Sequence, residues 1–405
     1  NIHSERFKMP DISKINDNIA PSATMEITAK ARELKSLGKP VIGFGAGEPD
    51  FPTPSYIVED AKKAAENPIF HKYSPVNGLP SLREEIARTA EEYSGYKISP
   101  DNALVTNGGK QAIITAFMSI LNPQDEVIIP KPYWTTYPEA VKIAGGKPIF
   151  IESSITSNFK VTKEQLEEAR TENTKVLVWT SPSNPTGAVY SPKESKEIYE
   201  WALSNNLWIM SDELYEHFVY EGDPTPSPAI IDSELRNTLI INGVSKAYSM
   251  TGWRVGWLIG NNEVINVSKK IQSHGVSNVS NISQAAAESA LKNGLDETLK
   301  MKDAFNRRRL LAVDILSNTK YIQTNTPNGA FYIYPDVSKV IEKRVIKNVN
   351  SSYDLCNWLL EELHIAFVPG EAFGTPGFIR CSYALGDDDL NEGLSRLSKS
   401  FNDFQ

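Results

Sequence analysis

The sequence is poor in cysteine, in long apolar runs and in net positive charge. Its two cysteines, Cys356 and Cys381, are too few for a disulfide framework or a cysteine-based metal cluster. No apolar run approaches the roughly 20 residues that span a bilayer, and residues 1–6 lack the apolar core of a signal peptide. A formal net charge of -8 argues against a general nucleic-acid or acidic-membrane surface. We therefore expect a cytoplasmic protein with no metal, nucleic-acid or membrane partner.

The rest of the composition is that of an ordinary globular enzyme. Apolar residues make up 40% and charged residues 23% of the 405 residues. A chain of this length has room for two or three domains and a large core. The negative overall charge is compatible with a small local cationic pocket for an anionic substrate.

Short apolar runs alternate with amphipathic helices through the middle of the chain. The apolar runs are 103–106, 127–129, 148–151, 176–179, 207–210, 238–244 and 253–260, and the helices include 134–143, 163–170, 192–205 and 261–273. This alternation predicts an α/β fold with a mostly parallel, seven-stranded, doubly wound sheet. Ligands bind such sheets beyond the carboxyl ends of the strands, where the chemically promising residues of this chain lie.

The C-terminal third follows a different pattern. Expected strands at 329–334, 364–368 and 378–383 alternate with helices at 352–363 and 388–403, which is typical of an α+β unit. We expect three segments. They are an N-terminal arm with part of a small domain (1–48), a large cofactor-binding domain (49–292) and the rest of the small domain (293–405).

Lys246 follows the apolar run 238–244 and has small residues around it. A desolvated ammonium group loses its proton readily, so this lysine is a candidate amine nucleophile. The alternative is an ordinary strand-to-loop turn with the charge in water. The hydroxyl of Ser245 and the fixed cation of Arg254 suit a phosphate. A phosphate-bearing aldehyde held as a Schiff base fits all three residues, which indicates pyridoxal phosphate.

A second candidate phosphate site follows the apolar run 103–106. Gly108, Gly109 and Lys110 come directly after it and open a helix. Such a helix start presents free backbone N–H groups to a phosphate. A plain strand-to-helix turn is the alternative.

Asp212 ends the apolar run that begins at residue 207. A carboxyl group buried at a strand end protonates unless a cation faces it, and a protonated pyridine nitrogen is a suitable cation. The alternative is a helix cap, because Asp212 precedes Glu213 and Leu214. Tyr215 can place its phenol near the 3-hydroxyl of the same ring, although tyrosines at this spacing are commonly core residues.

Two further residues are candidates for contacts with a ring. Asn184 lies in a loop that Pro182 and Pro185 make rigid, and a cis bond before Pro185 would aim its amide inward. The alternative for Asn184 is a polar surface turn. Trp134 can lie flat on an aromatic ring, but most tryptophans are buried core.

Arg380 lies in the middle of the expected strand 378–383. An arginine at such a position is costly unless it is paired. A bidentate carboxylate ligand would supply the pairing, and so would an internal salt bridge with Asp or Glu.

Together these motifs resemble the class I pyridoxal-phosphate aminotransferases of fold type I. The stretch 243–256 matches the lysine motif of that family, with an arginine eight residues after the lysine. The segments 184–187 and 212–215 and the strand of Arg380 recur in the family's order. The resemblance runs from about residue 21 to the C-terminal helix and so covers nearly the whole chain.

The resemblance implies a ping-pong transfer of an amino group through a Schiff base on Lys246. Lys246 would also move the proton between the substrate α-carbon and C4′ of the cofactor. It implies that Asp212 pairs with the pyridine nitrogen, that Asn184 and Tyr215 bind the 3-oxygen, and that Trp134 stacks on the ring.

The resemblance also implies how the two anionic groups are held. The cofactor phosphate would be surrounded by Gly109, Lys110, Ser245, Arg254 and Tyr73 of the partner subunit. Arg380 would bind the substrate α-carboxylate, helped by Asn184, Trp134 and the backbone of Gly47. A site that includes Tyr73 of the partner subunit requires a homodimer.

Within the family, segments 45–51, 108–112 and 250–254 resemble the bacterial and archaeal aspartate aminotransferase branch. In that branch a lysine at the position of Lys110 and a threonine at that of Thr24 bind the side-chain carboxylate. The implied reaction converts L-aspartate and 2-oxoglutarate into oxaloacetate and L-glutamate. Some members with the same pair also act on prephenate. An aspartate/glutamate-prephenate aminotransferase, or one for aromatic or other amino acids, is therefore the alternative.

Two other interpretations compete with an aminotransferase. A β-lyase would use the same cofactor for a different reaction. A non-catalytic regulatory module of aminotransferase-like fold is disfavoured because every catalytic position is intact.

Overall fold

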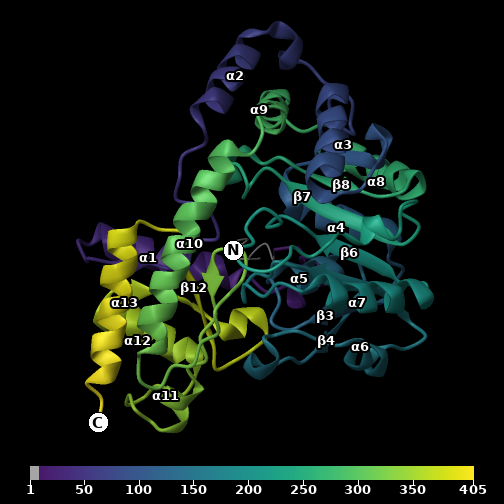
Figure 1. Ribbon diagram of the computed structural model, residues 1–405. Helices are drawn as coiled ribbons and strands as arrows, with labels where there is room; N and C mark the ends of the chain where they lie inside the picture. The colour runs from purple at the N-terminus through teal and green to yellow at the C-terminus, as the bar shows by residue number, and fades with distance from the viewer. Residues whose placement is uncertain (1–8) are drawn as a thin grey trace, which may run out of the picture.

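The computed structural model describes residues 9–405, apart from the side chains of Ala23 and Thr24, and a seven-stranded sheet lies at its centre (Figure 1). Its strands are β2 (Ala103–Thr106), β3 (Glu126–Pro130), β4 (Lys147–Ile151), β5 (Thr174–Thr180), β6 (Trp208–Asp212), β7 (Thr238–Gly243) and β8 (Gly256–Ile259). Their spatial order is β2-β8-β7-β6-β5-β3-β4. Only β8 is antiparallel to its neighbours, β2 and β7, so the predicted mostly parallel sheet is confirmed.

Helices cover both faces of this sheet. They are α2 (Ser55–Glu66), α3 (Pro80–Ser94), α4 (Gly108–Ile120), α5 (Thr136–Ile143), α6 (Lys163–Ala169), α7 (Pro192–Ser204), α8 (Asn262–Gly275) and α9 (Asn281–Lys292). Val127 and Ile129 of β3 pack in one core with α4, α5 and α8, whereas Ile128 packs in another core with α6 and α7. This alternation follows from the two-residue period of a strand. The sheet is therefore doubly wound, as predicted.

A smaller unit is built from the C-terminal third. Its elements are α10 (Asp296–Ser317), β9 (Tyr332–Ile333), α11 (Ser338–Glu342), α12 (Ser352–Leu363), β10 (Ile365–Ala366), β11 (Val368–Pro369), β12 (Ile379–Ser382) and α13 (Asp387–Asn402). Strands β11, β12 and β9 form an antiparallel sheet. The N-terminal segment joins this unit, because β1 (Ile42–Gly43) pairs with β10 and α1 (Ala23–Ser36) packs against β10 and β11. The domain boundaries after residues 48 and 292 stay a proposal.

One predicted strand is divided in two. The segment 364–368 forms β10 and β11 because β10 pairs with β1, whereas β11 pairs with β12. Phe367, between the two strands, is fully buried and stacks on Phe44 with ring centroids 4.8 Å apart. The predicted strand 329–334 is likewise reduced to the two residues of β9.

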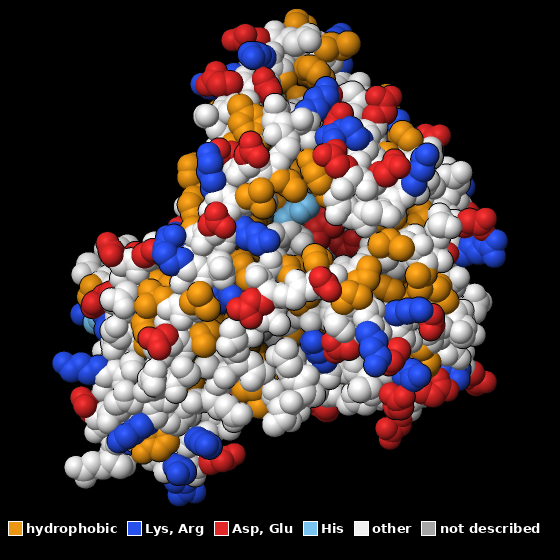
Figure 2. Space-filling view, in the orientation of Figure 1, with side chains coloured by type: hydrophobic (Ala, Val, Ile, Leu, Met, Phe, Trp, Pro, Cys, Tyr) orange, Lys and Arg blue, Asp and Glu red, His pale blue; other side chains and the backbone are white. Residues whose placement is uncertain are grey.

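The visible surface carries charges of both signs. Figure 2 shows lysine and arginine side chains interspersed with aspartate and glutamate over this face, without a large field of one sign. Among the helices that the structure describes, none has the length and apolarity to cross a bilayer.

Candidate active site

A cavity of about 510 Å³ lies beyond the carboxyl ends of β5, β6 and β7. The predicted site residues that line it are Gly47, Gly109, Lys110, Trp134, Asn184, Asp212, Tyr215, Ser245, Lys246, Arg254 and Arg380. Two predicted residues remain outside this set. Tyr73 is 90% exposed on the surface of the single chain, and Thr24 lies in α1 with its side chain outside the described part.

Lys246 lies three residues after the end of β7, and its side chain reaches across the cavity to the loop at Gly47. Its Nζ donates a hydrogen bond to the carbonyl of Gly47 and lies 5.8 Å from the centroid of the Tyr215 ring. Burial lowers the pKa of this amine to about 8, and the positive charge of Arg380 contributes in the same direction. A considerable fraction of Lys246 is therefore neutral near pH 8. The alternative of a fully hydrated surface lysine is wrong.

Asp212 lies at the end of β6 and is 5% exposed. Its Oδ2 accepts a 2.5 Å hydrogen bond from the Tyr137 hydroxyl, and its Oδ1 accepts one of 3.2 Å from the backbone N–H of Leu214. The carboxylate therefore caps the following turn and also lines the cavity. Burial raises its pKa, because the charged form loses its hydration. A cation placed in the cavity would stabilise the ionised form.

The start of α4 forms one wall of the cavity. Gly108 has φ +81, and a Cβ at this position would collide with the guanidinium of Arg254. A Cβ on Gly256 of β8 would come within 2.7 Å of the backbone of Gly108 and Gly109. These glycines let the helix start, the strand and Arg254 approach closely. The N–H groups of the first turn of α4 then face the same space as the cation, which is an arrangement that binds phosphate.

The hydrogen bonds of the Arg254 guanidinium within the described part of the chain go to backbone carbonyls. Its Nη1 donates to the carbonyl of Thr251 at 3.0 Å and its Nη2 to that of Asn107 at 3.2 Å. The residue has φ 56, because the chain turns from the short 3-10 helix Thr251–Trp253 into β8. No described carboxylate lies within ion-pair distance of Arg254, so its charge is available to an anion that also contacts Ser245.

Arg380 is 2% exposed and lies in β12. Its Nη1 donates to Oδ1 of Asn184 at 2.9 Å, and its Nη2 donates to the carbonyl of Gly45 at 2.8 Å. Its Nε has no hydrogen-bond partner among the described residues. An internal salt bridge with a described Asp or Glu is absent, so that alternative is wrong. The peptide bond between Asn184 and Pro185 is cis, which is one of the two arrangements considered for this loop.

Lys110 and Trp134 contact each other at the edge of the cavity. The ammonium of Lys110 lies 5.3 Å from the centroid of the Trp134 ring, and it forms no ion pair with the described residues. Burial, and then the nearby positive charge of Arg254, lower the pKa of Lys110. A dicarboxylic ligand would find an unpaired cation at this position.

The site suits an organic anion better than a metal ion. In the described part of the chain, no group of three or more His, Cys, Asp or Glu side chains could hold a metal. The cavity instead joins the amine of Lys246 and the carboxyl groups of Glu48 and Asp212 with four cationic side chains that form no ion pair with a described carboxylate, namely Arg32, Lys110, Arg254 and Arg380. These residues fit an aldehyde cofactor that carries a phosphate and a basic ring nitrogen.

The match to the family model for aminotransferases of class I and II covers residues 39–397. This chain belongs to that family. The aspartate aminotransferase of Streptomyces avermitilis is 50% identical to it over 383 residues, which are 94% of each chain. The aspartate/prephenate aminotransferase of Cereibacter sphaeroides is 43% identical and covers 94% of this chain and 96% of its own length.

Solved structures agree with this assignment. The aspartate aminotransferase of Rhizobium meliloti matches with a TM-score of 0.92 at 37% identity, over 98% of this chain and 100% of that one. The enzyme of Thermus thermophilus with maleate matches with a TM-score of 0.90 at 36% identity, over 96% of this chain and 100% of that one.

Several residues of this aminotransferase's cavity carry no sequence signal that predicts a functional role. Two of them are Tyr137, whose hydroxyl donates to Asp212, and Tyr332, whose hydroxyl is hydrogen-bonded to that of Tyr215 at 2.7 Å. Tyr137 lies in the expected helix 134–143 and Tyr332 in the expected strand 329–334, where a core residue and a site residue give the same pattern. The remaining lining residues without such a signal are Met25, Thr28, Ala29 and Arg32 of α1, with Gly45, Ala46, Glu48, Thr180, Leu214 and Thr251.

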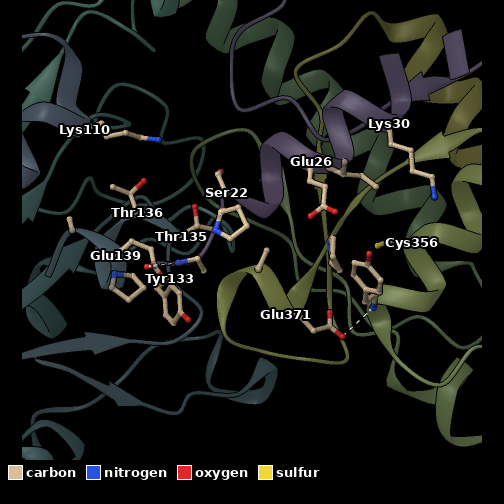
Figure 3. Close-up of a pocket in the computed structure, with 18 of the residues that line it drawn as sticks. Ser22, Glu26, Lys30, Lys110, Tyr133, Thr135, Thr136, Glu139, Cys356 and Glu371 are labelled. Carbon is tan, nitrogen blue, oxygen red and sulfur yellow. Dashed lines mark hydrogen bonds between the residues drawn. The ribbon is translucent and has the colours of Figure 1, made fainter. Parts of the chain in front are cut away.

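Helix α1 lines both the active-site cavity of this aminotransferase and a second cavity of about 580 Å³, which Figure 3 shows. Met25 and Arg32, two turns apart, line the first cavity, whereas Glu26 and Lys30 line the second. Figure 3 shows Glu26 and Lys110 on opposite sides of that second cavity. Lys110 lines both cavities, so the end of its side chain lies where they approach each other.

Proposed function

We propose that this aminotransferase transfers the amino group between L-aspartate and 2-oxoglutarate, giving oxaloacetate and L-glutamate, with pyridoxal phosphate as its cofactor. The single observation that carries the proposal is the buried guanidinium of Arg380. It has no carboxylate partner among the described residues and lines the same cavity as the amine of Lys246. A cation held in this way binds the carboxylate that all amino-acid substrates share.

When bound, pyridoxal phosphate supplies an electron sink beside the α-carbon of the substrate. Lys246, with a pKa of about 8, provides a neutral amine as nucleophile and as proton carrier. Asp212 would pair with the ring nitrogen and keep a proton on it. Tyr215 and Asn184 orient the 3-oxygen, and Trp134 covers the ring. These are the roles that the family resemblance implies, and the proposal is supported by the fact that all these side chains line one cavity.

Different residues bind the cofactor phosphate and the substrate α-carboxylate. The first turn of α4 at Gly109, together with Ser245, Arg254 and Lys110, holds the phosphate. Arg380, with Asn184 and the backbone of Gly47, holds the substrate α-carboxylate. Thr24 and Lys110 hold the side-chain carboxylate, which gives the preference for dicarboxylic substrates.

The choice of substrate is tested by steady-state rates with purified enzyme across a panel of donors and acceptors. We expect aspartate with 2-oxoglutarate to give the largest kcat/KM, and alanine and phenylalanine to give much smaller values. A flat profile, or elimination of the β-substituent in place of transamination, would contradict the proposal.

Prephenate is the second candidate acceptor, because relatives such as the enzyme of Cereibacter sphaeroides carry both substrates in their names. The same panel therefore includes prephenate with aspartate or glutamate as donor. A kcat/KM for prephenate above that for 2-oxoglutarate would select this alternative.

The attachment point of the cofactor is tested by chemical labelling. Borohydride reduction of the loaded enzyme followed by peptide mapping should place the label on Lys246. A Lys246→Ala variant should bind the cofactor without a covalent bond and lack turnover. A label on another lysine would refute the assignment.

We also propose a homodimer in which Tyr73 of each protomer reaches the phosphate of the other. Tyr73 is 90% exposed in the single chain, as a residue that contacts a partner would be. Complementation between protomers tests the shared site. Mixed dimers of Tyr73→Ala and Lys246→Ala protomers contain one site that carries both defects and one that carries neither. Activity above that of either parent is expected, and a mixture no more active than its parents would contradict sharing.

A further inference from the structure

The loop 45–51 connects β1 of the smaller unit to α2 on the large sheet. It supplies two backbone carbonyls to the active site. The carbonyl of Gly45 accepts from Nη2 of Arg380, and that of Gly47 accepts from Nζ of Lys246. The position of this one loop therefore affects both the carboxylate-binding arginine and the reactive amine.

Arg308 holds the far end of this loop. It lies on α10, its side chain is 6% exposed, and its Nη1 and Nη2 donate to the two carboxylate oxygens of Asp50 at 2.8 and 3.1 Å. Its Nε donates to Asp387, at the start of α13, at 2.9 Å. One guanidinium thus joins the loop to two helices of the smaller unit.

Aromatic packing fixes the guanidinium in place. Its carbon lies 5.3 Å from the ring centroid of Phe51, on the loop, and 5.8 Å from that of Phe305, one turn earlier on α10. The two rings contact each other edge to face at 5.8 Å. Because a bidentate pair sets the direction of the carboxylate as well as its distance, this contact orients the loop.

The next residue along the helix provides a natural comparison. Arg307 binds Asp387 through Nε and Nη2 at 2.7 and 3.1 Å, but it makes no contact with Asp50. Its side chain is 61% exposed, whereas that of Arg308 is nearly buried. Two adjacent arginines therefore share one acid, and only Arg308 reaches the loop.

We propose that Arg308 is a positioning residue of the active site. Its bidentate bond to Asp50 sets the loop 45–51, so that the carbonyls of Gly45 and Gly47 hold Arg380 and Lys246 in their working positions. The kinetic part of this proposal rests on the proposed function. The structural part concerns the loop alone.

The test compares Arg308→Gln with Arg307→Gln in the cofactor-loaded enzyme. Loss of the loop contact should raise KM for aspartate about tenfold or more, because small misplacements of binding groups have effects of this size. It should also shift the pH midpoint of the cofactor absorbance and speed hydrogen exchange in peptides covering residues 43–53. Arg307→Gln should leave all three measurements near those of the parent enzyme.

A second set of variants separates positioning from folding. Asp50→Asn keeps Arg308 and should reproduce the rise in KM. The double variant with Arg308→Gln and Asp50→Asn should have a KM no higher than that of Arg308→Gln alone, because both substitutions break the same contact between Arg308 and Asp50. Arg308→Lys keeps the charge without the bidentate geometry and should give an intermediate KM.

Equal effects of Arg308→Gln and Arg307→Gln on KM and on exchange of the loop would overturn the proposal. If Arg308→Gln does not fold, Asp50→Asn decides: a KM, absorbance midpoint and exchange rate like those of the parent would also overturn it. If the parent enzyme does not turn over aspartate, the proposed function fails. The comparison of hydrogen exchange in residues 43–53 still tests whether the contact between Arg308 and Asp50 positions the loop.

Discussion

The hydroxyl of Tyr137 donates a 2.5 Å hydrogen bond to Oδ2 of Asp212, and both side chains are almost fully buried. Burial raises the pKa of the tyrosine well above its ordinary value, so it stays protonated and acts as the donor. Burial also raises the pKa of Asp212, and the hydrogen bond opposes that rise. The pair therefore favours the ionised carboxylate, which is the form needed to face a cation.

Removing this donor should weaken the site without changing its shape. In Tyr137→Phe the pKa of Asp212 rises further, so a larger fraction of the carboxyl is neutral and cannot hold a proton on the cofactor ring. A hydrogen bond to a charged group contributes about 1.5 kcal/mol or more, so we expect roughly tenfold weaker cofactor binding. Equilibrium dialysis measures the dissociation constant of pyridoxal phosphate for the parent enzyme and for the variant. Tyr199→Phe is the control, because that hydroxyl bonds the carbonyl of Pro226.

The nucleophile should show its lowered pKa directly. Only the neutral amine of Lys246 attacks an aldehyde, so the rate at which cofactor-free enzyme captures pyridoxal phosphate should rise with pH and level off above about 8. Below that pH the ammonium form dominates and capture slows. Stopped-flow absorbance across the pH range measures the midpoint. A midpoint near the ordinary lysine pKa, or unchanged capture by Lys246→Ala, would contradict the role.

Part of this site could be predicted because strand ends place the next side chain at a known edge. Asp212 and Lys246 each follow an apolar run, and both line the cavity. Contacts between residues that are far apart in the sequence cannot be predicted from such local patterns. Arg308 and Asp50 are 258 positions apart, and Arg380 and Gly45 are 335 apart. Their pairing depends on how the smaller unit packs against the sheet, and the local hydrophobic periodicity of the sequence does not predict this packing.

Arg380 should affect every amino-acid substrate equally. Breaking a buried, hydrogen-bonded charge pair costs about 2 kcal/mol or more, so Arg380→Ala should raise KM roughly thirtyfold or more for aspartate, glutamate and alanine alike. The common factor follows because all three carry the same α-carboxylate. Arg380→Lys keeps the charge but not the planar fork, and should recover only part of the loss. A loss confined to dicarboxylic substrates would assign Arg380 to the side chain instead. Thermal unfolding of each variant separates this effect from loss of the bond to Asn184.

Lys110 should discriminate between substrates where Arg380 does not. Its unpaired ammonium lies at the cavity edge beside Trp134, so Lys110→Ala should raise KM for aspartate about tenfold and leave that for alanine within about twofold. Lys131→Ala is the matched control. That lysine also lies over an aromatic ring, 5.3 Å from the centroid of Phe150, but it is paired with Glu152 and does not line the cavity. The measurement is the ratio of the KM change for aspartate to the KM change for alanine, determined for each variant. Equal changes for aspartate and alanine, accompanied by weaker cofactor binding, would show that Lys110 serves the phosphate alone.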